Sequence, residues 1–352
     1  METALASVEL IAKNALPKGI ERLRITSRDD WHAMRAKDVT ASAISALVGA
    51  HDYETEYGLW AIKSGKVLPD QEETAAMERG TLLEPVAVEL LKKRYPDWKF
   101  LYPVAAYYRD PEFRIGATPD LFAVRPDRPG FGNIQIKSVD GGIFRTKWRA
   151  DGENVDPPIG AVIQSNAESS LTGASWSAVA SLVVGFGLDL HLVEFEIHAK
   201  IMAKLRAASL KLWTRVEDND PPPADFARDA ATIAALYPEA DEGKTIDLRG
   251  SNRARDLVET REVLKRDEAL GTAAVKARKV VDAEILSMLG DAAYGDLGDG
   301  RIISAKTIKR RGYEVAPSSY RTVSVKGETQ NARRSHAAAE GSQPAGAWDK
   351  PF

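Results

Sequence analysis

The alternation of apolar and polar positions predicts helices in the first hundred residues. The pattern becomes helical from Asp30, and residues 40–49 read as a short helix with a hydroxyl cap and a closing glycine. A second short helix is expected at residues 57–64. Residues 75–95 have an apolar stripe and three basic residues in the last turn, which is typical of an amphipathic helix.

Strand patterns follow this helical part. Residues 100–108, 114–124 and 133–139 are the first three candidates, and we expect the second and third to form a hairpin. A helix is expected at residues 159–171, after a Pro-Pro pair. Further strands at residues 176–184 and 192–197 complete an α/β core that ends near residue 200, and another helix is expected at residues 201–216.

Composition changes mark the remaining boundaries. The Pro221-Pro222-Pro223 run separates the core from the rest of the chain. The composition of residues 253–289 predicts one long helix or two collinear helices, ending at Gly290. Residues 301–308 and 320–325 resemble a basic hairpin, and the polar sequence after Lys326 resembles a flexible tail. The expected organisation comprises four parts: an arm (1–25), a core (26–216), a helical extension with the basic hairpin, packed on the core (217–326), and a tail (327–352).

The composition limits the possible chemistry. The 352 residues include no cysteine, which excludes disulfides, thiolate zinc sites and iron–sulfur clusters. Carboxylates remain as the main candidate ligands, and oxygen ligands favour Mg²⁺ or Mn²⁺. The sequence has neither a membrane-spanning run nor a secretory signal, so we expect no membrane association and a location in the cytoplasm, in a bacterial host cell.

The distribution of charge is more informative than its sum. The formal net charge is −3, but residues 301–326 contain seven Lys or Arg and only one acid, Glu314. This segment could follow a nucleic-acid backbone, and a solvated face is an equally good interpretation.

The segment from Arg114 to Val139 carries the clearest candidate chemistry. Asp120 closes one apolar segment and Lys137 lies inside the next, which is how a metal-dependent phosphodiesterase presents a ligand and a stabilising cation on adjacent strands. The Ile136 carbonyl and Glu84, from the preceding helix, are further candidate ligands. On spacing alone, a turn acid, a solvated lysine and a surface glutamate explain the pattern equally well.

Several separated motifs together resemble one family. Gly80 to Pro85 (Gly-Thr-Leu-Leu-Glu-Pro), Arg114 to Asp120 and Ile134 to Ser138 (Ile-Gln-Ile-Lys-Ser) are similar to the λ-exonuclease/YqaJ-type viral recombinases, within the PD-(D/E)XK nuclease superfamily. The resemblance covers roughly residues 30–200 and implies a restriction-endonuclease-like core, a mixed sheet flanked by helices.

The resemblance also implies roles for single residues. Glu84 becomes a metal-site acid, and Gln164 matches an active-site glutamine. Arg35, Thr40 and Ser42 resemble a grip on a terminal 5′-phosphate, a role that suits a guanidinium fork and hydroxyl donors. The alternative is that the hydroxyls only cap a helix. Two basic residues after the catalytic strand are candidate DNA contacts or solvated loop charges: Arg145 and Lys147.

Gln135 departs from the family pattern, which has Glu at this position. An amide can ligate a metal through its oxygen, but it removes one negative charge from the site. A natural active variant, an engineered inactive one and a degenerate end-binding protein all remain open. The expected function is a metal-dependent 5′→3′ exonuclease on double-stranded DNA ends that leaves 3′ overhangs; the alternatives are a structure-selective or restriction-type endonuclease and a silenced end-binding protein.

The resemblance further implies partners. A ring-shaped homo-oligomer, a trimer by resemblance, would encircle the duplex, and a single-strand annealing protein would take up the product. The terminal Trp348-Asp349-Lys350-Pro351-Phe352 is faintly similar to the docking tail of bacterial single-strand-binding proteins, although a simple disordered terminus is the favoured interpretation.

Overall fold

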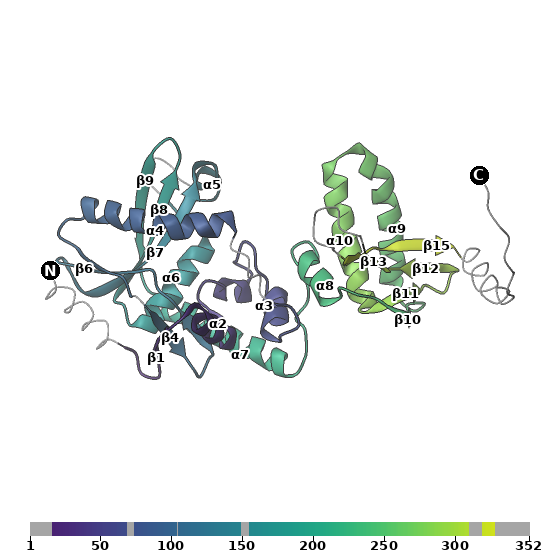
Figure 1. Ribbon diagram of the computed structural model, residues 1–352, viewed down its shortest axis with the longest axis horizontal. Helices are drawn as coiled ribbons and strands as arrows, with labels where there is room; N and C mark the ends of the chain where they lie inside the picture. The colour runs from purple at the N-terminus through teal and green to yellow at the C-terminus, as the bar shows by residue number, and fades with distance from the viewer. Residues whose placement is uncertain (1–15, 69–73, 104, 149–154, 310–318, 328–352) are drawn as a thin grey trace, which may run out of the picture. The chain divides into compact units, whose positions relative to one another are not determined.

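The computed structural model describes residues 16–68, 74–103, 105–148, 155–309 and 319–327. Its internal contacts divide the chain into two compact units, with the division between Pro223 and Ala224 (Figure 1). Within the described residues, no helix combines the length and apolar character needed to cross a membrane. The terminal tail and most of the expected arm lie outside the described residues.

Several helices of the first unit begin at residues that cap them. The side chains of Ser27, Thr55 and Thr74 each accept a hydrogen bond from a backbone N–H in the first turn of the helix that follows. The helices of this unit are α2 (Arg28–Lys37), η1 (Ile44–Val48), α3 (Glu56–Lys63), α4 (Ala75–Arg94), α5 (Gly141–Lys147), α6 (Ile159–Thr172) and α7 (Ala199–Glu217).

A five-stranded mixed sheet forms the centre of this unit. Its strand order is β3 (Lys99–Leu101), β6 (Leu121–Arg125), β7 (Arg128–Asp140), β8 (Trp176–Val184) and β9 (Leu188–Phe195). The expected hairpin is confirmed, because β6 and β7 pair antiparallel, whereas β7 and β8 pair parallel. The connection between these parallel strands contains α5 and α6.

Helices α4 and α6 pack on the central sheet. They contact alternate residues of β7, whose side chains point to opposite faces of the sheet. Ile134 and Ile136 of β7 belong to the same apolar cluster as Ala87, Val88 and Leu91 of α4. The odd-numbered residues of β7 point the other way because successive side chains alternate across a strand. They lie against α6, which contacts both β7 and β8.

A second, four-stranded sheet has the order β1 (Glu21–Arg24), β4 (Ala106–Asp110), β5 (Ile115–Ala117) and β2 (Val39–Thr40). Two predicted strands were wrong in extent, because each is divided between the two sheets. The first breaks before Pro103, and the second breaks at Pro119; proline has no N–H to donate to a ladder. The expected arm was also wrong at its end, since β1 pairs with β4.

The helix predicted for residues 40–49 was wrong in its first half. Thr40 lies in β2, where it pairs in parallel with Gly116 of β5. Only Ile44–Val48 is helical, as a 3₁₀ turn without a side-chain cap. Its closing residue was predicted well, since Gly49 takes the left-handed φ of 68° that favours glycine.

The second unit pairs helices with a small sheet. Its elements are α8 (Ala230–Leu236), β10 (Asp241–Asp247), α9 (Asn252–Asp267), η2 (Glu268–Leu270), α10 (Thr272–Leu289), β11 (Ala292–Asp296), β12 (Arg301–Ser304), β13 (Thr307–Lys309), β14 (Ser319–Arg321) and β15 (Ser324–Gly327). One sheet has the order β10-β11-β12-β15, and β13 pairs with β14.

The prediction of collinear helices was wrong, because α9 and α10 pack against each other. The chain reverses at Gly271, whose φ of 156° few other residues adopt. Leu257 and Val258 of α9 share an apolar cluster with Val281 and Ile285 of α10, and Arg253 donates to Glu284 at 2.5 Å.

The basic hairpin exists, but not all its cations face solvent. Arg321 is buried, and its guanidinium donates to the backbone carbonyls of Gly290, Ala292 and Ala305. Neither suggested role, a solvated charge or a contact to a nucleic-acid backbone, therefore applies to Arg321. Arg310 and Arg311 lie outside the described residues.

Candidate active site

The pleat of β7 places the candidate site on the α6 side of the central sheet. Gln135 is 3% exposed, and it lies between Asn133 and Lys137 on the same face of the strand. Polar residues on a buried strand face need partners, because an unpaired buried polar group costs free energy. Helix α6 supplies these partners from Gln164 and Glu168.

Asp120 lies immediately before β6 and reaches into the adjacent strand. Its Oδ2 accepts a hydrogen bond from the backbone N–H of Ile136 at 2.8 Å and another from Nε2 of Gln135. Nε2 of Gln135 also donates to the carbonyl oxygen of Ile136 at 3.3 Å. The structure therefore brings together three of the predicted site residues, Asp120, Gln135 and Ile136.

Lys137 and Gln164 form the second half of the site. Nζ of Lys137 donates to Oε1 of Gln164 at 2.8 Å. Nε2 of Gln164 donates to Oε1 of Gln135 at 2.8 Å and to Oε1 of Glu168 at 2.9 Å. The strand and the helix are thus joined by a continuous chain of polar side chains.

Sequence reasoning missed two members of this chain, Glu168 and Asn133. Glu168 is 1% exposed, and its Oε2 accepts from Nδ2 of Asn133 at 3.1 Å. Each of them had a signal in the sequence: Glu168 follows Gln164 by four positions, which places both on one face of a helix, and Asn133 precedes Gln135 by two positions on a strand.

The pKa values of three acidic side chains in the site are raised. Burial raises the pKa of Asp120, although Lys137 and the hydrogen bonds from Ile136 and Gln135 oppose the shift. Burial, followed by the negative charge of Asp120, raises the pKa of Glu168. The same two causes raise the pKa of Glu84 on α4 to about 7.

The donor set suits a hard divalent cation, with one exception. Asp120, Glu84 and the Ile136 carbonyl offer the oxygen atoms that Mg²⁺ and Mn²⁺ prefer. Gln135 instead turns its NH₂ group toward Asp120 and the carbonyl. Among the described residues, no three His, Asp or Glu side chains are grouped closely enough to hold a metal ion.

Arg35, Thr40 and Ser42, the candidate phosphate grip, also come together. Nη2 of Arg35 donates to Oγ of Ser42 at 3.4 Å, and the hydroxyls of Ser42 and Thr40 are 3.0 Å apart. The Arg35 guanidinium lies 4.3 Å from the centre of the Trp31 ring, which restricts its orientation.

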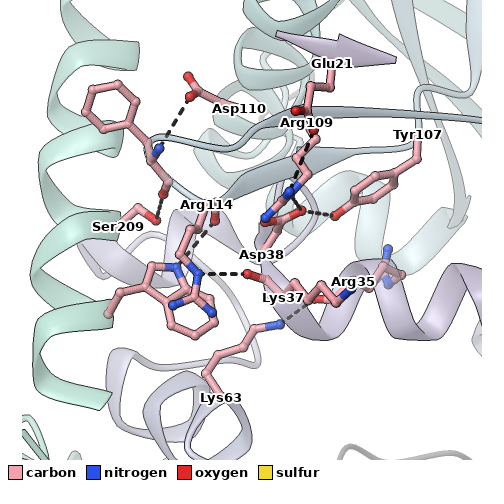
Figure 2. Close-up of polar contacts among 12 residues, drawn as sticks. Glu21, Arg35, Lys37, Asp38, Lys63, Tyr107, Arg109, Asp110, Arg114 and Ser209 are labelled. Atoms are coloured by element: carbon pink, nitrogen blue, oxygen red, sulfur yellow. Dashed lines mark hydrogen bonds and ion pairs between the residues drawn. The ribbon is translucent and has the colours of Figure 1, made fainter. Parts of the chain in front are cut away.

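Buried interactions fix the helix that carries Arg35 (Figure 2). Asp38, directly after α2, accepts from Nε of Arg109 at 2.9 Å and from the Tyr107 hydroxyl at 3.1 Å. Nζ of Lys63 donates to the backbone carbonyl of Arg35 at 2.8 Å. These contacts hold the end of α2 against β4 and α3.

A cavity of about 390 Å³ connects the two groups of residues. Ser42 lines one part of it, and Lys137 and Gln164 line another. Its lining also includes Ser45, His51, Arg79 and Lys147. Basic side chains and hydroxyls along one hollow are a suitable environment for a phosphorylated ligand.

Arg145 and Lys147 differ from the prediction in their setting, because they lie on helix α5 and not in a loop. Lys147 lines the cavity, where its Nζ pairs with Asp52 at 2.8 Å and lies 5.5 Å from the centre of the Tyr53 ring. Arg145 is exposed and is not among the residues that line the cavity.

The α/β class predicted from the sequence is confirmed. Asp120 directly precedes β6, and Gln135 and Lys137 lie on the paired strand β7, which is compatible with a PD-(D/E)XK-like core. Residues 30–174 match the YqaJ-like viral recombinase domain, which is the family that the motifs in the sequence resemble. The predicted family is therefore confirmed.

Known proteins resemble the chain over larger parts of its length. An uncharacterized protein YqaJ from Bacillus subtilis (strain 168) is 23% identical over 278 residues, which are 78% of this chain and 82% of that protein. The crystal structure of an alkaline exonuclease (LHK-Exo) from Laribacter hongkongensis is 21% identical, with a TM-score of 0.41 over 58% of this chain and 100% of the other. The same exonuclease in complex with dAMP gives 18% identity and a TM-score of 0.40 over the same shares.

Proposed function

We propose that this protein is a nuclease acting on DNA, and more narrowly a Mg²⁺-dependent 5′→3′ exonuclease that degrades double-stranded DNA from its ends and leaves 3′ overhangs. One observation carries the proposal: a single cavity is lined by Ser42 of the candidate phosphate grip and by Lys137 and Gln164 of the candidate catalytic group. The match of residues 30–174 to the YqaJ-like viral recombinase domain supports a role in processing DNA.

The residues have separate tasks in this proposal. Arg35 and Ser42 bind the terminal 5′-phosphate, and the Thr40 hydroxyl orients Ser42. This anchoring sets the distance from the DNA end to the scissile phosphodiester. Arg145 and Lys147 on α5 contact the DNA backbone, which requires Lys147 to exchange its partner Asp52 for a phosphate.

Lys137 acts at the scissile group. Gln164 accepts a hydrogen bond from its ammonium and holds it in position beside Asp120. From there Lys137 orients the attacking water and stabilises the charge that develops on the phosphorus oxygens. Asp120, Glu84, the Ile136 carbonyl and Oε1 of Gln135 would hold a Mg²⁺ or Mn²⁺ ion, which supplies an activated water and neutralises charge on the phosphate when bound.

The orientation of Gln135 supports one alternative, a silenced protein that binds DNA ends without cutting them. Its NH₂ group contacts Asp120 and the Ile136 carbonyl, which are two of the expected metal ligands. A neutral amide also attracts a cation less strongly than a carboxylate does.

The decisive experiment is digestion of linear 5′-phosphorylated duplex beside closed circular DNA, with Mg²⁺ or Mn²⁺. The parent chain is compared with Gln135→Glu. We expect degradation of the linear DNA only, faster in the Glu variant. Activity confined to the variant would identify a silenced nuclease, and cutting of circles would support an endonuclease. Inactivity of both would overturn the nuclease proposal.

The proposed assembly and partners require separate tests. A ring-shaped trimer would keep the enzyme on its duplex, and a single-strand annealing protein would receive the overhang. The molecular mass of the full chain in solution tests the first proposal. Co-purification with a candidate annealing protein, with and without the last five residues, tests the second and the proposed docking role of the tail.

A further inference from the structure

The side chains around Gln164 permit only one orientation of its amide. Nζ of Lys137, which can only donate, lies 2.8 Å from one end of the amide. The Glu168 carboxyl, whose two oxygens accept from Gln164 and Asn133, lies at the other end. Because the ammonium can only donate, Gln164 must direct its oxygen to Lys137, and its NH₂ group is then directed to Glu168, which accepts from it.

This orientation determines that of Gln135. The Gln164 NH₂ group also faces Gln135 at 2.8 Å, so the atom of Gln135 that meets it must be the acceptor, Oε1. The NH₂ group of Gln135 is then left to face Asp120 and the Ile136 carbonyl. Reversing Gln135 alone would place two NH₂ groups against each other.

We propose that Glu168 is a positioning residue that acts through Gln164 to direct the Gln135 NH₂ group toward the cation position. The inference rests on the proposed function for the identity of that position. In the metal-free protein the NH₂ group occupies the place where a cation would contact Asp120 and Ile136. A cation therefore binds only after both amides have exchanged their hydrogen bonds, which lowers its affinity.

The inference is specific to an amide at position 135. A glutamate there would accept from Gln164 with one oxygen and offer the other to a cation, so the chain of hydrogen bonds would need no rearrangement. Gln135 and Glu168 consequently act as a pair, although each is hydrogen-bonded to Gln164 and not to the other.

The test is a titration of the full chain with Mn²⁺ in the absence of DNA. The electron paramagnetic resonance signal of free Mn²⁺ measures how much of the ion is bound. Gln164→Met changes no charge and releases Gln135, so we expect about three- to tenfold tighter binding, the equivalent of one lost hydrogen bond. In a Gln135→Leu background the same substitution should change the affinity less than about twofold. Weaker or unchanged binding in Gln164→Met, or an equal gain in both backgrounds, would overturn the inference.

An exchange variant tests the orientation itself. Gln164→Glu combined with Glu168→Gln keeps the net charge and exchanges donors for acceptors in this chain of hydrogen bonds. The carboxylate at position 164 then accepts from both Lys137 and the NH₂ group of Gln135. We expect Mn²⁺ binding at least as tight as in Gln164→Met. Binding no tighter than that of the parent would contradict the proposal.

A metal-independent measurement separates this inference from the proposed function. If no variant, including Gln135→Glu, binds Mn²⁺, the metal-dependent nuclease proposal fails while the coupling can still be measured. Denaturant unfolding in EDTA of Gln135→Leu, Glu168→Leu and the double variant should then give non-additive effects. Additive effects would refute the coupling between the two residues.

Discussion

Lys137 and Gln164 are joined by a hydrogen bond of 2.8 Å between Nζ and Oε1, although 27 positions separate them in the sequence. The contact connects strand β7 to helix α6 and directs the only ammonium on this face of β7 toward the cavity. It also gives the lysine a fixed direction, which a flexible four-carbon side chain lacks by itself.

Replacing Lys137 by Met should abolish cleavage while preserving DNA binding. The ammonium stabilises charge mainly in the transition state, so its loss should lower kcat roughly 100-fold or more. Steady-state digestion measures this effect, using the parent or Gln135→Glu, whichever is the more active. Lys66→Met on the loop after α3 is the control and should leave cleavage within about twofold. Full activity in Lys137→Met would remove this residue from the mechanism.

Replacing Arg35 by Ala should remove the preference for phosphorylated ends. A guanidinium bonded to phosphate contributes roughly 1.5–3 kcal/mol, so the ratio of kcat/KM on 5′-phosphate and 5′-hydroxyl ends should fall by about 10-fold or more. Arg28→Ala changes an exposed arginine on the same helix and is the matched control. An unchanged ratio in Arg35→Ala would show that the terminal phosphate is bound elsewhere.

The stability of the metal-free protein should depend on the ionisation of Glu84. Burial and the charge of Asp120 raise its pKa from 4.5 to about 7, so the folded protein binds this proton more tightly than the unfolded chain. The resulting stabilisation is fully present below pH 4.5 and is lost as the pH rises through about 7. Denaturant unfolding in EDTA across this range should show a smaller decline for Glu84→Gln than for the parent; identical slopes would contradict the expected shift.

Removing Arg109 should destabilise the fold around the phosphate grip. The side chain of Asp38 is fully buried, and Arg109 is its ion-pair partner (Figure 2). Arg109→Leu removes the ion-pair partner of that carboxylate and leaves it the hydrogen bond from the Tyr107 hydroxyl; breaking a buried ion pair typically costs about 3–5 kcal/mol. Denaturant unfolding followed by tryptophan fluorescence measures the loss, with Arg24→Leu on the neighbouring strand β1 as control. Equal stability of the two variants would mean that the pair is not needed to hold α2.

Substituting Gly132 should disturb the sheet that carries the site. A Cβ added at Gly132 would lie 2.1 Å from the ring of Trp176, which is fully buried on the adjacent strand β8. Since neither strand can move without breaking the ladder, Gly132→Ala should lower the unfolding free energy by roughly 1–3 kcal/mol. Gly187→Ala, where an added Cβ has open space, is the control. A neutral Gly132→Ala would imply that Trp176 has room to shift.

The sequence by itself determined most helices and the chemistry of the site. Caps such as Thr55 and Thr74, and stop signals such as Gly49 and Gly290, act locally, so they can be read without the fold. The family could be recognised because the order and spacing of the motifs around Asp120 and Lys137 are properties of the sequence.

The tertiary structure decided how strands are shared and which polar groups meet. Residues 100–108 and 114–124 have continuous strand patterns, but each is divided between two sheets, because long-range pairing and proline positions determine where a ladder ends. The spacing of four places Glu168 on the same helix face as Gln164, but only the packing of α6 on β7 buries it beside Gln164 and Asn133. The orientation of the Gln135 amide depends on Lys137 and Glu168 together, so hydrogen-bond direction, which no local pattern encodes, decides it.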